Sequence, residues 1–484
     1  MVSSPSTRDR YYWSAIGVIG FYLFSSLWLS YHRLGWYDEV LTFLISRLPR
    51  VTFGAALRGA AAALPPGYFL LARLFAGLPG SGDGAMRIPS ALALAAGLWI
   101  TFECARRATD NLHGLAAVAL LTTSLLPYYG YEARPYAAYF LLMAVGFWLW
   151  NHPESDRKPV AGLFGATFLL AFGLHYHSVL CLVPYTLFET SLGMRRRPSA
   201  KLMAAGLGVI CGAAMLWPHM REASKFSARF WAAPSQFALR EVFGEIFPCG
   251  WLIAAAALVW IAWMVRLEKI VLLPMLPVER LGWLFLSVPL AGFLLAKVIT
   301  NAFYSRYFIC MLPGVAIAFA CALWRRFGSS PRVTAGIVTL MLLVGVGKQV
   351  EVMAQPWKIV PPPIPAEGPL LRAMLAMEPV LLSDRKVIVP GADTLLGLEA
   401  RYYSKRPEAY ALLLHSDLGS LGRAHLNMAR FMPMRFWSMD DLRAHALDAA
   451  LIDPSEETLK EMRAAGFQTK ILPSDGPKIV YLVR

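Results

Sequence analysis

Long apolar stretches separated by short polar ones dominate the first 350 residues of the chain. An α-helix rises about 1.5 Å per residue, so roughly 20 apolar residues cross the ~30 Å hydrocarbon core of a bilayer. The stretches that approach this length are 11 to 31, 88 to 105, 114 to 130, 134 to 150, 160 to 175, 178 to 193, 202 to 217, 249 to 265, 281 to 300, 307 to 323 and 333 to 350. The pattern therefore predicts about eleven membrane spans. The first, Tyr11 to Tyr31, lacks a small-x-small cleavage site and predicts an uncleaved span.

Residues 36 to 87 are too broken to cross in this way. Apolar residues recur at helical spacing from Val40 to Leu48, and the stretch is then interrupted by Pro49 and by Pro65-Pro66. This pattern predicts two or three helices that lie in the outer membrane interface. The alternative makes Gly67 to Leu78 a short true span, which would invert the topology of everything downstream.

The pattern changes again after residue 355. Pro356 to Pro365 is a proline-rich linker, and residues 366 to 484 have the patterning of a soluble domain. The expected strands are 386 to 389, 449 to 452, 467 to 472 and 478 to 483, and the expected helices are 393 to 404 and 454 to 465, the second capped by Asp453. Gly391 and Asp393 follow the first strand and are expected to form a turn and a helix cap, with ligand binding as the alternative. The predicted fold is thus mainly α: a polytopic helical bundle over 1 to 355, with a first outer loop at 32 to 87, the linker at 356 to 365, and a small α/β domain at 366 to 484.

Composition supports membrane insertion and excludes a soluble enzyme. The chain of 484 residues is 57% hydrophobic and only 16% charged, and its mean hydropathy is +0.49. The net charge of +15 would suit a nucleic-acid partner, but Lys and Arg cluster in short loops between apolar runs. That distribution is typical of cytoplasmic loops of membrane proteins, so we expect no nucleic-acid partner. The six cysteines form no CxxC pair and indicate no metal site.

The basic loops also orient the chain. They hold Arg8 and Arg10, Arg106 and Arg107, Arg157 and Lys158, Arg195 to Arg197 with Lys201, Arg266 with Lys269, and Arg325 with Arg326 and Arg332. The positive-inside rule assigns this side to the cytoplasm. An odd number of spans then gives a multi-pass protein of the inner (cytoplasmic) membrane with a cytoplasmic N-terminus and an extracytoplasmic C-terminal domain.

Candidate chemical groups all fall on the predicted outer side. They are Asp38 and Glu39 after the first span, Tyr131, Glu132, Arg134 and Tyr136 at the mouth of another, His175 and His177 at a turn between spans, and Arg306 and Tyr307 at the start of a later span. A carboxylate can take a proton from an acceptor, arginines suit a phosphate leaving group, and aromatic rings stack on sugar faces. A divalent metal stays open, because Glu132 with His175 or His177 would bind one only if distant segments meet.

The motifs that contain these residues occur in a family-like order. Asp38-Glu39 is followed by Pro65-Pro66-Gly67-Tyr68-Phe69, Arg87-Ile88-Pro89-Ser90, Glu132-Ala133-Arg134-Pro135-Tyr136, and Arg306-Tyr307. Over residues 11 to 325 this order resembles the C-type membrane glycosyltransferases. The nearest groups are the bacterial relatives of the protein O-mannosyltransferases and the lipid A aminoarabinose transferases.

The resemblance implies an inverting glycosyltransferase. Its donor would be a polyprenyl phosphate sugar, its acceptor a protein, lipid or polysaccharide that the sequence does not identify, and Asp38 would be the general base. Glu132 would help to organise the site, and Arg134 and Arg306 would stabilise the phosphate. The family often has histidine before the double proline, where this chain has Leu64, so nothing is carried over for acceptor binding there.

Simpler roles remain open for each group. Asp38 and Glu39 would also suit the N-terminus of an interfacial helix, Glu132 and Arg134 an ion pair, and Arg87, Arg134 and Arg306 interfacial anchoring. Two other classes of function are alternatives. A transporter or lipid flippase would place charges near the bilayer midplane and show repeated halves, whereas a receptor or pseudoenzyme would depend on residues 366 to 484 and not on the acids.

Overall fold

The computed structural model describes residues 5–58, 64–78, 82–153, 157–191, 198–224, 233–248, 250, 274–328, 330–356, 367–390, 394–413, 435–454, 456–472 and 478–483. The chain divides into two compact units. The first consists of Met1–His32, Leu64–Arg221 and Trp231–Ala354, and the second of Arg33–Ala63, Glu222–Phe230 and Gln355–Arg484. The predicted linker, the predicted span at 249 to 265, Gly391 and Asp393 lie almost wholly outside the described residues.

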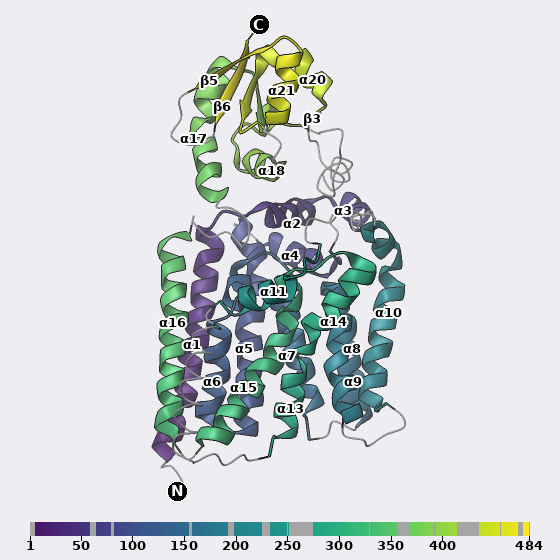
Figure 1. Ribbon diagram of the computed structural model, residues 1–484, viewed down its shortest axis with the longest axis vertical. Coiled ribbons are helices and arrows are strands. Elements are labelled where there is room, and N and C mark those ends of the chain that lie inside the picture. The colour runs from purple at the N-terminus through teal and green to yellow at the C-terminus, as the bar shows by residue number, and fades with distance from the viewer. Residues whose placement is uncertain are drawn as a thin grey trace. The chain divides into compact units, whose positions relative to one another are not determined.

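The first unit is helical throughout its described residues (Figure 1). Its α-helices are α1 (Pro5–His32), α4 (Gly67–Ala76), α5 (Ile88–Ala108), α6 (Asn111–Thr122), α7 (Tyr136–Trp150), α8 (Lys158–Leu174), α9 (Leu182–Ser191), α10 (Ala200–Ala223), α11 (Ala238–Ile246), α13 (Pro277–Leu284), α14 (Ser287–Leu295), α15 (Leu312–Phe327) and α16 (Pro331–Ala354). Shorter turns join them: η1 (Asp83–Arg87), η2 (Leu126–Tyr131), η3 (Tyr176–Cys181), η5 (Ala296–Thr300) and η6 (Ser305–Met311).

Among the described residues, six helices are long and apolar enough to cross a membrane, and four apolar helices are shorter. The predicted number of about eleven spans is therefore not confirmed, although the mainly helical fold is. Several predicted spans are divided by short 3-10 turns. The stretch at 114 to 130, for example, is α6 followed by η2, because Pro127 and Gly130 interrupt the helix.

Helix α4 bears on the alternative topology. It has 10 residues, which at 1.5 Å per residue gives a length of about 15 Å, half of the hydrocarbon core. A helix of this length does not span the bilayer by itself, so Gly67 to Leu78 is too short for the alternative crossing.

The helices approach one another closely where they carry glycine. A Cβ at Gly282 in α13 would clash with the backbone carbonyl of Gly314 and lie 2.8 Å from Cβ of Ala318, both in α15. Gly208 in α10 meets the backbone of Gly165 in α8 in the same way. Small residues at such contacts are how membrane helices pack, since lipid offers no hydrophobic force to press them together.

A buried ion pair also joins α13 to α15. Arg325 donates from Nη2 to Glu279 at 2.9 Å and from Nε at 3.1 Å, and the Glu279 carboxylate is fully buried. Two parallel hydrogen bonds of this kind fix the relative rotation of the helices as well as their separation.

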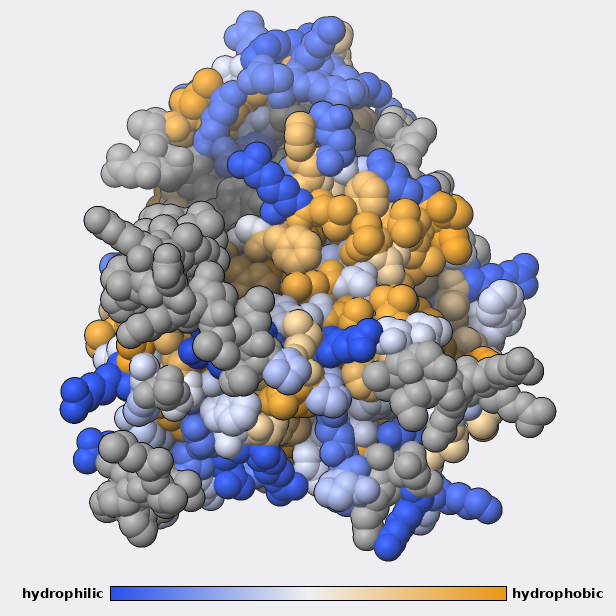
Figure 2. Space-filling view, turned by 60° about the horizontal axis from the view of Figure 1, so that its bottom comes forward, coloured by the Kyte–Doolittle hydropathy of each residue, from blue (hydrophilic) through white to orange (hydrophobic). Residues whose placement is uncertain are grey.

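Large apolar side chains cover the outside of the first unit. Exposed ones lie on α8, α10, α14 and α16: Leu163, Leu170, Leu207, Ile210, Met215, Trp217, Leu290, Leu294, Leu340 and Leu343. Figure 2 shows an orange, hydrophobic surface in the middle of its view, with blue, hydrophilic side chains gathered below it. A soluble protein rarely exposes so much contiguous apolar surface, whereas lipid covers it at no cost.

The second unit combines helices with a small sheet. Its elements are α2 (Tyr37–Arg47), α3 (Arg50–Arg58), α17 (Glu367–Asp384), β1 (Val387–Pro390), α18 (Thr394–Tyr403), η8 (Pro407–Ala409), β2 (Ala411–Leu413), β3 (Arg435–Trp437), α20 (Met439–Ala444), η9 (Ala446–Asp448), β4 (Ala449–Ile452), α21 (Glu456–Ala464), β5 (Gln468–Leu472) and β6 (Ile479–Val483). One sheet has the order β1-β4-β6-β5, with β1 and β4 parallel and β6 antiparallel to both neighbours. The parallel pair β2-β3 is joined to β1 by a bridge between Ile388 and Tyr410.

The four strands and two helices expected after residue 366 are present, within one or two residues of their predicted ends. The expected cap by Asp453 is wrong. Asp453 adopts the left-handed conformation with φ of 46°, and its carboxylate accepts a hydrogen bond from the Lys478 amide at 2.9 Å. Its side chain therefore ties β4 to the start of β6, a contact with no local sequence signal.

Candidate functional site

The backbone turn from Glu132 to Arg134 is the centre of the site in the first unit. The Arg134 amide donates to the Glu132 carbonyl at 2.8 Å. The Ser90 hydroxyl donates to the Arg134 carbonyl at 3.2 Å and lies 2.7 Å from the Tyr68 hydroxyl. Tyr68 and Ser90 belong to the sequence motifs that precede this turn, so those motifs act by holding the turn in place.

This turn and the start of η6 bring buried charges together. Glu132 is fully buried, and Arg134 and Arg306 are 5% and 7% exposed. The guanidinium of Arg306 lies 4.9 Å from the ring centre of Tyr304 and 5.7 Å from that of Tyr136. Burying two arginines and a carboxylate costs several kcal/mol per ion. Buried ionisable groups of this kind cluster at functional sites, and they also occur in structural ion pairs.

Aromatic rings and two histidines line the same region. His175 lies between Tyr139, whose ring stacks on it at 5.4 Å, and Tyr307 at 5.0 Å. His177 stacks on Tyr307 at 4.7 Å, and Tyr136 lies 5.8 Å from His175. Four of the predicted residues, His175, His177, Tyr136 and Tyr307, are therefore in contact with one another.

Both histidines are neutral at pH 7. Burial lowers the pKa of His177 to about 4. Burial also holds the pKa of His175 well below its usual range, and the positive charges of Arg306 and Arg134 act in the same direction. These arginines can influence His175 only because η3, η6 and the Glu132 turn converge.

The tautomer of His175 follows from its hydrogen bond. Its Nδ1 accepts from the His177 amide at 3.3 Å, so the single proton of the neutral ring lies on Nε2. Nε2 of His175 and Nε2 of His177 are buried and have no hydrogen-bond partner among the described residues. A buried polar atom normally has a partner, and a bound ligand or water would supply it here.

Two predicted residues have structural contacts. Arg87, which is 1% exposed, donates to the Ser30 carbonyl at 2.7 Å and so ties η1 to the end of α1. Tyr131 packs edge-on against Tyr128 at 5.4 Å. Arg87 therefore holds the start of α5, which carries Ser90.

Asp38 and Glu39 lie in the second unit, at the N-terminus of α2. The Glu39 carboxylate forms a buried ion pair with Arg33 and accepts from the Trp36 amide at 3.4 Å, which caps the helix. Asp38 is half-buried, and its carbonyl accepts from the Thr42 hydroxyl at 3.0 Å. The two adjacent acids thus have different surroundings, with Glu39 inside and Asp38 partly accessible.

No group of three or more His, Cys, Asp or Glu side chains able to hold a metal ion occurs in the described part of the chain. His175 and His177 lie together, with ring centres 5.1 Å apart.

Sequence reasoning missed Glu245 in α11. Burial raises the pKa of this half-buried carboxyl, and nearby Ser305 and Arg306 counteract the shift. Tyr304, which lies against Arg306, precedes it by two residues in the same sequence motif. The only local signal for Glu245 is an acid one residue before a buried Ile246 in an amphipathic helix, which is too common to single out.

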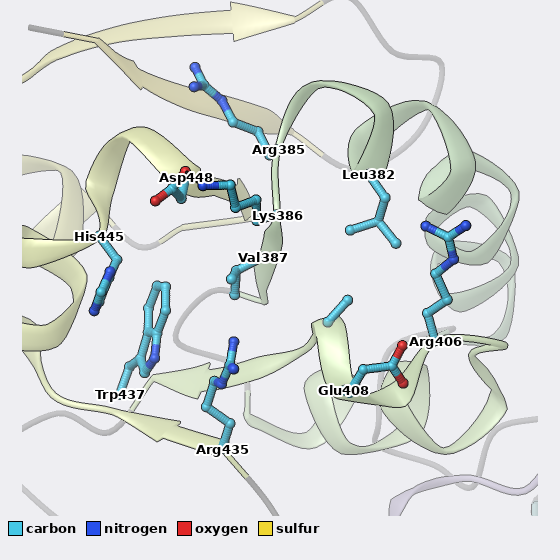
Figure 3. Close-up of a pocket in the computed structure, with 11 residues that line it drawn as sticks. Leu382, Arg385, Lys386, Val387, Arg406, Glu408, Arg435, Trp437, His445 and Asp448 are labelled. Carbon is cyan, nitrogen blue, oxygen red and sulfur yellow. Dashed lines mark ion pairs between the residues drawn. The ribbon is translucent and has the colours of Figure 1, made fainter.

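Two cavities bear on the search for a site. One in the first unit, of about 400 Å³, is apolar and adjoins α11. Its lining residues are Leu120, Phe243, Gly244, Phe247, Gly250, Trp283, Val315 and Phe319. The other, of about 660 Å³, lies in the second unit at the N-terminal ends of β1, β3 and β4, where Lys386 pairs with Asp448 at 3.1 Å (Figure 3). None of the predicted site residues lines either cavity.

Comparisons with known proteins agree with this architecture. Residues 63–221 match the family described as dolichyl-phosphate-mannose-protein mannosyltransferase. Two crystal structures of ArnT from Cupriavidus metallidurans are similar to the chain at 14% identity. The apo form has a TM-score of 0.63 over 99% of this chain and 98% of that one, and the form bound to undecaprenyl phosphate has 0.61 over 97% of each. An oligosaccharyltransferase from Archaeoglobus fulgidus is similar at 10% identity over 88% of this chain and 63% of that one, with a TM-score of 0.42. No curated protein sequence matches.

The family match and the shared fold confirm the resemblance to the C-type membrane glycosyltransferases that the motif order indicates. The segment 63–221 contains the Tyr68, Ser90, Glu132 and Arg134 contacts described above. The apolar helices and the ArnT-like fold identify a multi-pass membrane protein.

Proposed function

Because the chain has the fold of ArnT and resembles the C-type glycosyltransferases, we propose that it transfers a sugar from a polyprenyl phosphate donor to an acceptor at the outer face of the cytoplasmic membrane. The observation that carries the proposal is the buried group of Glu132, Arg134 and Arg306 beside two neutral histidines. An ArnT structure holds undecaprenyl phosphate, which is a donor carrier of the required class.

The reaction proceeds with inversion at the anomeric carbon. The Asp38 carboxylate takes the proton of an acceptor hydroxyl or amine, and the freed oxygen or nitrogen bonds to the anomeric carbon. The bond from that carbon to the phosphate oxygen breaks, and the polyprenyl phosphate leaves with the bonding electron pair. Asp38 suits this role better than Glu39, because Asp38 is half-buried, whereas Glu39 is fully buried in its ion pair with Arg33.

Arg134 and Arg306 stabilise the phosphate as it leaves. Their guanidinium groups are buried, where each charge acts more strongly than in water. The Nε2 donor of His175 contributes a hydrogen bond to the phosphate or the sugar, and Tyr136 and Tyr307 stack on the sugar face. Glu132 balances the two arginines and keeps them oriented.

The apolar cavity beside α11 supports a lipid-linked donor. Helix α11 packs against η6, which begins with Ser305 and Arg306, and its Phe243 and Phe247 line the cavity. The apolar lining of this cavity suits a hydrocarbon chain.

The experiment begins with a strain that lacks the gene. We expect this strain to accumulate a polyprenyl phosphate sugar and to lose one envelope glycan, both visible by mass spectrometry of extracts. Restoring the wild-type gene returns the glycan, and restoring Asp38→Asn does not, although the variant is present in the membrane at the wild-type level.

Asp83→Asn is the matched control, because it removes the charge of another half-buried aspartate between the first span and α5. It should restore the glycan. Full restoration by Asp38→Asn would show the proposed mechanism to be wrong. A flippase would give a different result. In the deletion strain the donor would accumulate only in the inner leaflet, and sugar transfer in extracts would be normal without the protein.

A further inference from the structure

Helix α2, which carries Asp38, packs in the second unit with α18, which is some 350 residues later in the sequence. Trp36, Tyr37, Val40 and Leu41 form a buried cluster with Leu398 of α18. Leu44, Tyr402 and Tyr403 pack around this cluster, and both helices are labelled in Figure 1. Burial of four apolar side chains against one helix is a contact worth several kcal/mol.

Two adjacent tyrosines of α18 bind the two ends of α2. The hydroxyl of Tyr403 accepts a hydrogen bond of 2.6 Å from the Gly35 amide, immediately before the first residues of α2. The hydroxyl of Tyr402 accepts one from Arg47, the last residue of α2. The two rings meet edge to face at 5.0 Å, so they are braced against each other.

These contacts leave α2 little freedom to slide or rotate. An 11-residue helix is about 16 Å long, and hydrogen bonds at both ends with an apolar seam between them fix its axis and its rotation. Inside the N-terminal turn, the ion pair of Glu39 with Arg33 and its bond to the Trp36 amide fix the backbone around Asp38. The position of the Asp38 carboxylate therefore depends on the contacts that α2 makes with α18.

We infer that α18 holds α2 in the position that the reaction requires. Tyr403 and Leu398 of α18 are then positioning residues that act through Asp38 of α2. The inference rests on the proposed function, because it assigns the C-terminal part of the chain a role in the same reaction. General-base catalysis needs the carboxylate within hydrogen-bond reach of the acceptor proton, and a displacement of about 1 Å can cost a factor of ~100 in rate.

The test uses the full chain purified in detergent, the donor lipid isolated from the deletion strain, and an envelope extract of that strain, which holds the unmodified acceptor. Tyr403→Phe removes only the hydroxyl that binds the Gly35 amide. We expect kcat to fall by a factor of about 10 to 100, with the KM for the donor unchanged. We also expect faster amide hydrogen exchange in the peptide that covers residues 36 to 47.

Tyr410→Phe is the matched control. Tyr410 is fully buried in the C-terminal sheet region, and its hydroxyl donates to Glu378 of α17 at 2.9 Å, whereas that of Tyr403 binds the Gly35 amide before α2. Its loss should leave kcat and the exchange of residues 36 to 47 at wild-type values. An equal fall in kcat for Tyr410→Phe would assign the effect to general destabilisation and overturn the inference.

The rate of Asp38→Asn, measured beside that of Tyr403→Phe, separates this inference from the proposed function. If Tyr403→Phe has the wild-type rate and Asp38→Asn is inactive, the inference about α18 is wrong and the proposed mechanism stands. A fully active Asp38→Asn removes the mechanism itself, whatever Tyr403→Phe does.

Discussion

At the scale of single residues, the two acids of the first outer loop differ in what surrounds them. Glu39 is fully buried against Arg33 and caps α2, whereas Asp38, the next residue back, is half-buried. Adjacent residues of a helix point about 100° apart, so one can face the interior of the unit while the other faces outward. The sequence leaves helix capping open as a role for either acid, and the structure shows this role for Glu39.

The buried arginines offer a second test at this scale. Replacing Arg306 by glutamine removes a charge that lies over Tyr304 and Tyr136. We expect the transfer rate to fall by a factor of about 100 to 1,000, as for loss of one group that stabilises transition-state charge. Arg306→Lys should recover part of the rate, because lysine retains the charge and loses the planar fork of donors.

The rate is measured as release of polyprenyl phosphate by the purified protein. Arg107→Gln is the control, because the Arg107 side chain is 58% exposed and pairs with Glu103 of the same helix at 3.3 Å. This variant should be active. A rate for Arg306→Gln within twofold of wild type would leave Arg306 as an interfacial anchor.

At the scale of elements, glycine contacts and an ion pair join neighbouring helices of the first unit. The α13 and α15 helices meet at Gly282 and Gly314 and are joined by Glu279 and Arg325. The hydropathy pattern predicts each span separately, and it contains nothing about which glycine faces which neighbour.

Gly282→Ala tests this close contact. The new methyl group would strike the Gly314 carbonyl and Ala318, and backbone cannot move aside as a side chain can. We expect a loss of about 1 to 3 kcal/mol of stability from overpacking, and hence a lower melting midpoint in detergent. Differential scanning fluorimetry measures it.

The same substitution at Gly206 of α10 is the control, because a Cβ there would meet nothing within 4 Å. Alanine is favoured over glycine inside a helix by about 1 kcal/mol, so Gly206→Ala should leave the midpoint unchanged or raise it. Equal midpoints for the two variants would mean that α13 and α15 do not meet at Gly282.

At the scale of the whole molecule, the fold extends along nearly all of the chain. ArnT matches over 99% of this chain at 14% identity, although the sequence motifs that indicate the family end near residue 325. The C-terminal residues therefore belong to the shared architecture. Their sequence alone gives no hint of it, since ordinary α/β patterning occurs in many unrelated proteins.

The orientation of the molecule gives a prediction at this scale. We expect alkaline phosphatase fused after Arg484 to be active, and fused after Arg197 to be inactive, because the enzyme folds only outside the cytoplasm. The physical reason is the run Arg195 to Arg197, which resists transfer across the membrane. Green fluorescent protein at the same two positions should give the opposite pattern. The reverse result would place Asp38 on the cytoplasmic side and contradict the proposed reaction.

The sequence by itself determined the membrane class, most helices, the C-terminal strands and the chemical groups worth examining. These follow from local rules, since hydropathy over some 20 residues and alternation along a strand need no knowledge of the fold. Only the tertiary structure decided that Tyr68 and Ser90 hold the Glu132 turn, that His175 and His177 meet Tyr307, and that α2 packs on α18. Each of these contacts joins segments far apart in the chain. Their distances depend on helix packing and glycine contacts that no local pattern encodes.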